Sequence, residues 1–173
     1  MKFYKYHGAG NDFLIADGRG KTLNISPEYI SAVCDRHTGF GADGVMVLED
    51  SQDYDFRMRY YNSDGSGGMM CGNGGRCIVA FAADLGYKHF DFEAPDGLHI
   101  ATVESAESFA PTARIVSLKM KDVAGAVSHE DGWFLDTGTR HFVKFVSDLA
   151  TCDVFHEGRR LRQDLRFAPA GTN

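Results

Sequence analysis

The sequence has few of the residues that cross-link small secreted proteins. Its 173 residues include 4 cysteines, and no two of them form a Cys-x-x-Cys pair. Cysteines this sparse and unevenly spaced argue against a disulfide framework, a zinc ribbon or a dithiol redox motif. Proline is also scarce, at 4 residues, and the 20 glycines follow no repeat, so the composition is not that of a collagen-like chain.

Long apolar runs and an excess of positive charge are absent too. The longest apolar run, from Cys77 to Ala83, is far shorter than the roughly 20 residues that a membrane-spanning helix needs. The first residues interleave lysines with aromatic residues and lack the apolar core of a signal peptide. A formal net charge of −6 offers no cationic surface to nucleic acid. We therefore expect a cytoplasmic protein without a membrane or nucleic-acid partner.

What is present is typical of a globular protein, with 43% hydrophobic and 24% charged residues. Ser26 followed by Pro27 and Glu28 predicts the start of a helix that ends near His37. Its apolar face should hold Tyr29, Ile30, Val33 and Cys34. Alternating apolar residues and turn signals predict strands, the first two as a hairpin, at 2–6, 12–16, 45–48, 56–61, 90–94, 98–103, 115–120, 133–137 and 142–146.

One predicted helix differs from the rest. Residues 76–86 are apolar nearly all round, between a glycine cluster and Gly86, and a helix without a polar face is surrounded by protein. Strands on both sides in the sequence predict an α+β fold, a β-barrel-like sheet around this central buried helix. A change of composition at 106–112 predicts an N-terminal lobe, 1–112, which carries Cys71 and the helix, and the start of an incomplete second lobe, 113–173.

A glycine loop at 39–44 has the spacing Gly-x-Gly-x-x-Gly of dinucleotide sites. That motif joins a strand to a helix, whose N-terminus then receives the pyrophosphate. Here the loop follows a predicted helix and precedes a predicted strand. We therefore interpret it as a tight loop and not as a nucleotide site.

Cys71 lies just ahead of the buried helix, in Met70-Cys71-Gly72-Asn73-Gly74. Free N–H groups and the dipole at a helix start favour a thiolate, so a reactive Cys71 is expected. Gly72 and Gly74 would leave the backbone amides open to an anion such as an amino-acid carboxylate. The alternative is an ordinary small residue in a turn. Structural roles are expected for the other three cysteines: Cys77 in the buried helix, Cys34 on a helix face and Cys152 in a strand-like run.

Four blocks together resemble the diaminopimelate epimerase family, and the resemblance runs along the whole chain. They are His7-Gly8-Ala9-Gly10-Asn11-Asp12-Phe13, residues 39–44, Asn62-Ser63-Asp64-Gly65-Ser66 and Met70-Cys71-Gly72-Asn73-Gly74-Gly75-Arg76-Cys77. The resemblance implies two similar lobes with an active site between them. It also implies a homodimer without cofactor or metal. The implied reaction interconverts LL- and meso-2,6-diaminopimelate by two-base proton transfer, in lysine and peptidoglycan biosynthesis.

The resemblance also implies roles for particular residues. Cys71 matches the catalytic cysteine of the first lobe, and His141 matches the histidine that tunes the acidity of the cysteines. Gly44 stands where the family can have a substrate-facing Gln, Gly68 where it commonly has an acid, and Thr139-Arg140 where it often has Asn-Pro. The implied substrate-binding residues are Asn11, Asn62, Gly72, Asn73 and Asn173.

The family has a second catalytic cysteine, in a Gly-Thr-Gly-type block beyond the position of Asn173. We therefore expect the 173-residue chain to hold only the first cysteine and to be inactive alone. Three alternatives stay open. They are another isomerase of the same fold, such as a proline or hydroxyproline racemase or a phenazine-synthesis-type isomerase, a non-catalytic half-site that serves binding, and a cysteine hydrolase with Cys71 as nucleophile and His141 as base.

Overall fold

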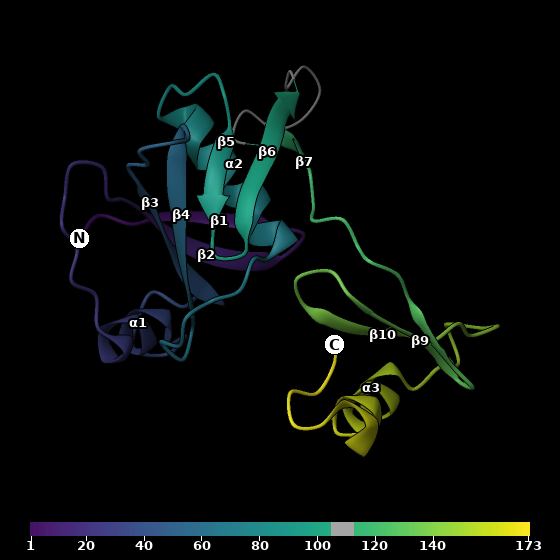
Figure 1. Cartoon of the computed structure of the whole chain (residues 1–173). Coiled ribbons are helices and arrows are strands. Elements are labelled where there is room, and N and C mark those ends of the chain that lie inside the picture. Colours follow the sequence, from purple (N-terminus) through teal and green to yellow (C-terminus); the bar gives the residue numbers. More distant parts are fainter. Residues whose placement is uncertain (105–112) are drawn as a thin grey trace. The chain divides into compact units, whose positions relative to one another are not determined.

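The computed structural model describes residues 1–104 and 113–173 (Figure 1). These residues form two compact units, Met1–Met120 and Lys121–Asn173. The boundary expected at 106–112 lies in the segment outside the described residues, so the expected division into lobes stays a prediction.

A seven-stranded sheet forms the frame of the first unit, with its strands in sequence order. Neighbouring strands are antiparallel except for two parallel pairs, β2 with β3 and β4 with β5. Each parallel pair needs a crossover, and a helix supplies it in both cases. The strands are β1 (Tyr4–Gly8), β2 (Asn11–Asp17), β3 (Gly44–Glu49), β4 (Phe56–Asn62), β5 (Asp91–Ala94), β6 (Gly97–Glu104) and β7 (Ile115–Leu118).

The two crossover helices, α1 (Pro27–Cys34) and α2 (Gly72–Asp84), cover opposite faces of the sheet. On β2, Phe13 and Ile15 pack in the cluster that contains α2, whereas Leu14 between them packs in the cluster that contains α1. Successive side chains of a strand point to opposite faces, so this alternation requires a helix on each side. This is why Phe13 to Ala16 are all buried.

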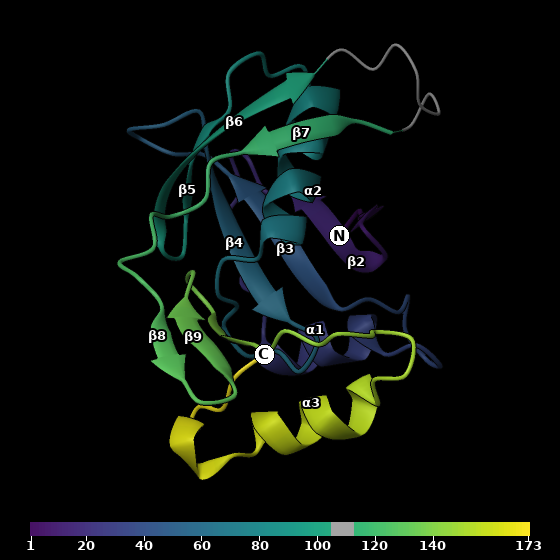
Figure 2. The same cartoon turned by 90° about the vertical axis from the view of Figure 1, so that its right-hand side faces the viewer.

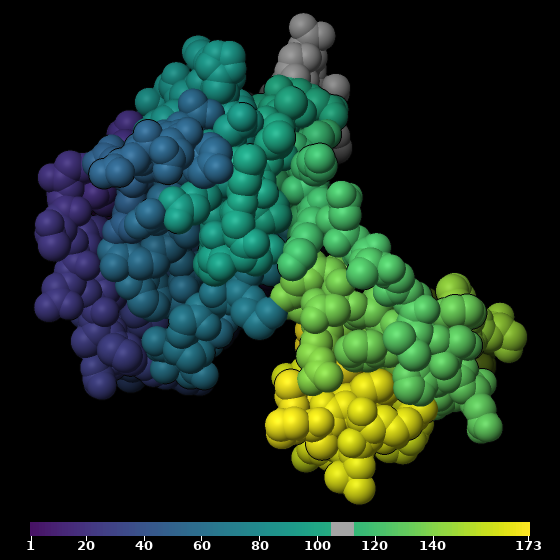
Figure 3. All heavy atoms as spheres, in the orientation of Figure 1, coloured from purple at the N-terminus to yellow at the C-terminus, as the bar shows by residue number. Residues whose placement is uncertain are grey.

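Helix α2 is the centre of the first unit, and the sheet curls around it (Figures 1 and 2). It contacts β1, β2 and β3 as well as β6 and β7. Ile78, Val79 and Phe81 are 0–1% exposed. The all-atom view shows this unit as one closely packed body (Figure 3). The predicted α+β class, with a sheet around a central buried helix, is therefore confirmed.

The ends of the two helices differ from expectation. Helix α1 ends at Cys34, before His37, because the Asp35 carboxylate accepts the N–H groups of His37 and Thr38 at 2.8 and 2.6 Å and starts a turn there. Tyr29 was expected on the apolar face but is 41% exposed. Helix α2 begins at Gly72, so the glycine block forms its first turn.

The second unit holds an antiparallel meander, β8 (Val127–His129), β9 (Gly132–Asp136) and β10 (Arg140–Val143). A helix, α3 (Val154–Arg162), and a 3₁₀ turn, η1 (Leu165–Phe167), follow. Phe167 is 2% exposed, and its ring centroid lies 5.1 Å from that of Phe142 and 5.5 Å from that of Phe134. Aromatic stacking thus forms the centre of this unit.

The sequence pattern did not predict β8 or α3. The strand-like run expected around Cys152 is wrong, because Asp153 caps α3 there by accepting the N–H of His156 at 3.1 Å. Glu157 in the first turn and basic residues in the last turn support this helix through its dipole. An N-cap aspartate followed by an acid was the signal that could have revealed it.

We predict that Phe81→Ala lowers the free energy of unfolding by about 3–5 kcal/mol, because it empties a fully buried site in the central helix. Phe81 packs against Tyr4 and Tyr6, with ring centroids 5.0 and 5.8 Å apart. Urea denaturation measures the loss. The control is Leu98→Ala at a side chain that is 47% exposed, which should change stability far less; equal losses would contradict the packing described here.

Candidate functional site

Cys71 is the N-cap residue of α2, with an extended backbone (φ −120°, ψ 122°). The first helical bond runs from the Gly75 N–H to the Cys71 carbonyl at 2.7 Å. The Cys71 side chain makes no capping hydrogen bond. The first N–H groups of a helix have no intrahelical acceptor, so those at the start of α2 can receive an anion.

A hairpin brings Asn11 to Cys71. The turn between β1 and β2 is made by Ala9 and Gly10, whose φ angles are 53° and 86°. The Cys71 Sγ lies 3.6 Å from the Asn11 Oδ1, and the Asn73 Nδ2 lies 3.4 Å from the same oxygen. Three of the expected site residues, together with Gly72 between two of them, therefore form one cluster.

Asn62 lies at the same end of the strands as Asn11. Strand β2 begins at Asn11, and β4 ends at Asn62, which pairs in register with Gly44 at the start of β3. The Asn62 Nδ2 donates to the Ser66 Oγ at 3.0 Å and to the Gly67 carbonyl at 3.3 Å. These bonds hold the amide within the turn that follows β4.

The Tyr60 ring explains two of the departures from the family pattern. A Cβ at Gly68 would lie 1.9 Å from a Tyr60 ring carbon, and a Cβ at Gly44 would lie 2.6 Å from another. Burial, followed by the nearby charges of Cys71 and Asp43, raises the pKa of Tyr60 to about 12. Tyr60 is thus part of this site, although its sequence context, an aromatic pair in a strand, indicated only packing.

The glycines at the start of α2 serve mainly its packing. A Cβ at Gly75 would lie 2.5 Å from the Met70 Cε and 2.7 Å from the Leu118 Cδ2. A Cβ at Gly72 would have no neighbour closer than 3.7 Å. The expectation that Gly72 and Gly74 leave room for a ligand therefore suits Gly72, whereas a Cβ at Gly74 would lie 3.3 Å from the Met46 Sδ and so meet the core. Gly75 lets the helix approach its neighbours.

An ion-pair network lies beside the cluster, at the start of β2. Arg36 contacts the Asp12 and Asp43 carboxylates at 2.8 and 2.7 Å, and Lys5 contacts Asp12 at 2.7 Å. The hydrogen bond from Arg36 is the main cause that lowers the pKa of Asp12 below its usual range. Asp43 belongs to the glycine loop, which follows α1 and precedes β3 as expected.

His141 and Asn173 lie together in the second unit. The Asn173 N–H donates to the Arg140 carbonyl and the Phe142 N–H donates to the Asn173 carbonyl, each at 2.9 Å, so Asn173 runs alongside β10 at His141. The His141 Nε2 lies 2.9 Å from the Thr139 Oγ1. Arg162 holds the Asn173 side chain through its Oδ1 at 2.8 Å.

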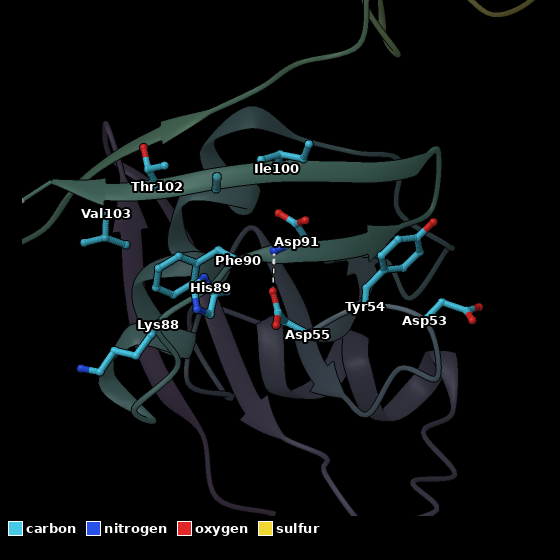
Figure 4. Close-up of a pocket in the computed structure, with 11 residues that line it drawn as sticks. Asp53, Tyr54, Asp55, Lys88, His89, Phe90, Asp91, Ile100, Thr102 and Val103 are labelled. Carbon is cyan, nitrogen blue, oxygen red and sulfur yellow. Dashed lines mark hydrogen bonds between the residues drawn. The ribbon is translucent and has the colours of Figure 1, made fainter.

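A separate cavity of about 620 Å³ lies between the loop at 53–55, residues 88–91 and β6 (Figure 4). The Asp91 N–H donates to the Asp55 carboxylate at 2.8 Å across it. None of the expected site residues lines this cavity.

Among the helices of the described residues, none combines the length and the hydropathy of a membrane-spanning segment.

Comparison with known proteins identifies the family to which the chain is similar. The profile of the family described as diaminopimelate epimerase matches residues 3–114. A diaminopimelate epimerase of Flavobacterium psychrophilum is 45% identical over an aligned length of 179 residues, which covers 100% of this chain and 66% of the relative. One of Chlorobaculum tepidum is 42% identical over 173 residues, 96% of this chain and 65% of the relative. The chain thus spans about two thirds of the length of these relatives.

A solved structure supports the fold. The crystal structure of a phenazine biosynthesis protein of the PhzF family from Bacillus anthracis superposes with a TM-score of 0.59, over 88% of this chain and 58% of that one. At 19% identity, this likeness concerns the fold alone.

We predict that Gly68→Ala lowers the free energy of unfolding by about 1–3 kcal/mol, because the added Cβ collides with the Tyr60 ring. In a Tyr60→Ala background the same substitution should cost little, because the ring is gone. Urea denaturation of the four proteins closes the double-mutant cycle. Equal costs in both backgrounds would show that Tyr60 does not occupy this space.

We also predict that Asp12→Asn lowers stability at pH 7 by roughly 1–3 kcal/mol, since it breaks charged hydrogen bonds. The folded state lowers the pKa of Asp12, so its contribution is complete above the unfolded value of 3.8 and is lost as the pH falls through the lower folded value. The difference in the free energy of unfolding between wild type and variant should therefore become smaller below about pH 4. Urea titrations from pH 2 to 7 test this, with the exposed Asp53→Asn as control; a constant gap would contradict it.

Proposed function

The chain belongs to the diaminopimelate epimerases, a family of isomerases, and we propose that the protein containing it interconverts LL- and meso-2,6-diaminopimelate. The reaction moves a proton at an α-carbon, in lysine and peptidoglycan biosynthesis. The proposal includes a cytoplasmic location and two lobes, 1–112 and 113–173, as the composition predicts, and a homodimer, as the family resemblance implies. It rests on one observation above all, the Cys71 thiol at the start of α2 within 3.6 Å of the Asn11 amide.

Removing the α-proton without a cofactor is difficult because the negative charge that develops can spread only into the substrate's own carboxylate. The N–H groups at the start of α2 would hold that carboxylate, and no acidic side chain occupies the first turn to repel it. Preorganised donors of this kind contribute roughly 3 kcal/mol each in other enzymes. The proposal therefore uses the helix start both as a binding site and as a stabiliser of the developing charge.

In the proposed reaction, the Cys71 thiolate takes the α-proton on one face of the carbon, or the thiol returns it. Inversion needs a second acid–base group on the opposite face. Cys34 and Cys77 are each 4% exposed, and burial raises the pKa of the Cys77 thiol to about 12. Neither buried thiol is suited to that role, so we assign only Cys71.

The remaining expected residues complete the proposal. Asn11, Asn62 and Asn73 lie at the sheet edge and helix start that carry Cys71, where their amides would bind the polar groups of the substrate. We propose Asn173 as a further substrate contact and His141 as the group that tunes the acidity of the cysteines. Asn173 is hydrogen-bonded to the residues on either side of His141 in β10, which supports a shared role for these two residues.

We predict that Cys71→Ser lowers the exchange of the substrate's α-proton by about 10²–10⁴-fold, because a serine hydroxyl is a much weaker base at neutral pH. The protein, expressed from its complete gene, is incubated with diaminopimelate in heavy water. Deuterium incorporation at the α-carbons is then followed by NMR.

The matched control is Cys77→Ala, which removes a buried thiol of the same helix. It should retain exchange if it folds, as circular dichroism would show. Normal exchange by a folded Cys71→Ser variant would remove Cys71 from the mechanism. Absence of exchange in the wild-type protein would refute the proposed reaction itself.

A further inference from the structure

A carboxylate of the glycine loop lies directly behind the Asn11 amide. The Asp43 Oδ2 accepts the Asn11 Nδ2–H at 2.7 Å and the Asp12 N–H at 3.2 Å. The Asp43 N–H donates in turn to the Asp12 carbonyl at 2.9 Å. These two bonds to the Asp12 backbone, one from the Asp43 N–H and one to its carboxylate, fix the glycine loop against the start of β2, and Arg36 holds the other Asp43 oxygen at 2.7 Å.

The charge of Asp43 determines which way the Asn11 amide faces. An ionised carboxylate only accepts hydrogen bonds, so the amide must turn its nitrogen toward Asp43. Its oxygen then faces the other side, where the Cys71 Sγ lies at 3.6 Å and the Asn73 Nδ2 at 3.4 Å. With Asp43 ionised, the reverse orientation would bring two acceptors together.

The Arg76 guanidinium orients the Asn73 amide so that its hydrogen bonds run in the same direction. The Arg76 guanidinium donates to the Asn73 Oδ1 at 2.5 Å, which turns the Asn73 nitrogen toward Asn11. Arg76 has donors only, so this orientation is as strict as that of Asn11. The hydrogen bonds therefore run in one direction from Arg76 through Asn73 and Asn11 to Asp43, and the Cys71 thiol donates to the middle of this chain.

We propose that Asp43 is a positioning residue: it holds the Asn11 oxygen toward Cys71 and thereby favours the protonated thiol in the resting site. This inference rests on the proposed function, in which Cys71 exchanges a proton with the substrate. The helix start favours the thiolate, whereas an acceptor that faces the sulfur favours the thiol. The orientation of one amide therefore shifts the balance between the two forms.

The other ionisable groups near Cys71 come from two elements and one loop of the described chain. Tyr60 faces it from β4, Arg76 and Cys77 belong to α2, and Asp43 precedes β3. A change confined to Asp43 leaves the first three in place. Its effect on Cys71 then has two parts, the lost negative charge and the weaker hold on the Asn11 oxygen, and both favour the thiolate.

The test measures alkylation of Cys71 by iodoacetamide across pH in the protein expressed from its complete gene, with the modified peptide quantified by mass spectrometry. In Asp43→Asn, the introduced amide has one oxygen where the carboxylate has two, so it cannot accept from Arg36 and from Asn11 at the same time. The Asn11 amide is then no longer fixed from the side of residue 43, and only the hydrogen bond from Asn73 keeps its oxygen toward the sulfur. We expect the pH midpoint of alkylation to fall by about one unit.

A double variant separates orientation from general damage. Asn11→Asp with Asp43→Asn exchanges the carboxylate and the amide, so an acceptor faces Cys71 again while the total charge stays the same. Its midpoint should return to the wild-type value or rise above it. The matched control is Asp50→Asn, which makes the same charge change at the opposite end of β3, where Asp50 accepts the Gly20 N–H at 2.6 Å.

The alkylation midpoints of these variants either support or overturn the proposal. A folded Asp43→Asn variant whose midpoint equals that of Asp50→Asn overturns the proposal, and so does a double variant whose midpoint stays below wild type. If Asp43→Asn alone does not fold, the double variant still decides. Alkylation requires no turnover, so a wild-type protein that fails to exchange the α-proton of diaminopimelate would refute the proposed reaction without affecting this result.

Discussion

The burial of a glycine-rich helix start against the inner face of a sheet is the constraint on which the first unit depends. Helix α2 carries almost no side-chain bulk in its first turn, and Gly75 meets the Met70 and Leu118 side chains where any Cβ would collide. Further along, Ile78 and Phe81 fill the space that the curled sheet encloses. The same helix therefore anchors the core at one end and leaves backbone N–H groups unsatisfied at the other.

That arrangement determines where chemistry can occur. The strands that cover α2 begin or end beside its N-terminus, so Asn11, Gly44 and Asn62 reach it from three different strands. Sites built on strand ends and a helix start are held more rigidly than sites on long loops. Tyr60 adds a constraint of its own, because its ring takes the space that side chains at positions 44 and 68 would need. The two departures from the family pattern at positions 44 and 68 are thus one packing solution.

Sequence patterns predicted the parts of the fold in which a periodic signal coincides with burial. The alternation of Phe56 and Met58 and the apolar run after Arg76 both mark core faces, and both lie where expected. The second unit was harder, since α3 is highly charged and only its Asp153 cap marks its start. Tyr60 and Asp43 could not be found by pattern. Their importance comes from contacts with residues distant in sequence, which neither composition nor spacing encodes.

The glycine loop shows why a motif must be judged by what it joins. Its spacing matches a nucleotide site, yet it follows α1 and leads into β3, so it does not join a strand to the start of a helix. What the loop does instead is bring the Asp43 carboxylate to the start of β2, where the Asp12 N–H donates to that carboxylate and the Asp12 carbonyl accepts the Asp43 N–H. A carboxylate fixed in this way can orient a neighbouring amide without touching a ligand. Arg76 orients the Asn73 amide in a corresponding way, because a guanidinium only donates hydrogen bonds. With a cation at one end and a carboxylate at the other, all the hydrogen bonds of the cluster run in one direction.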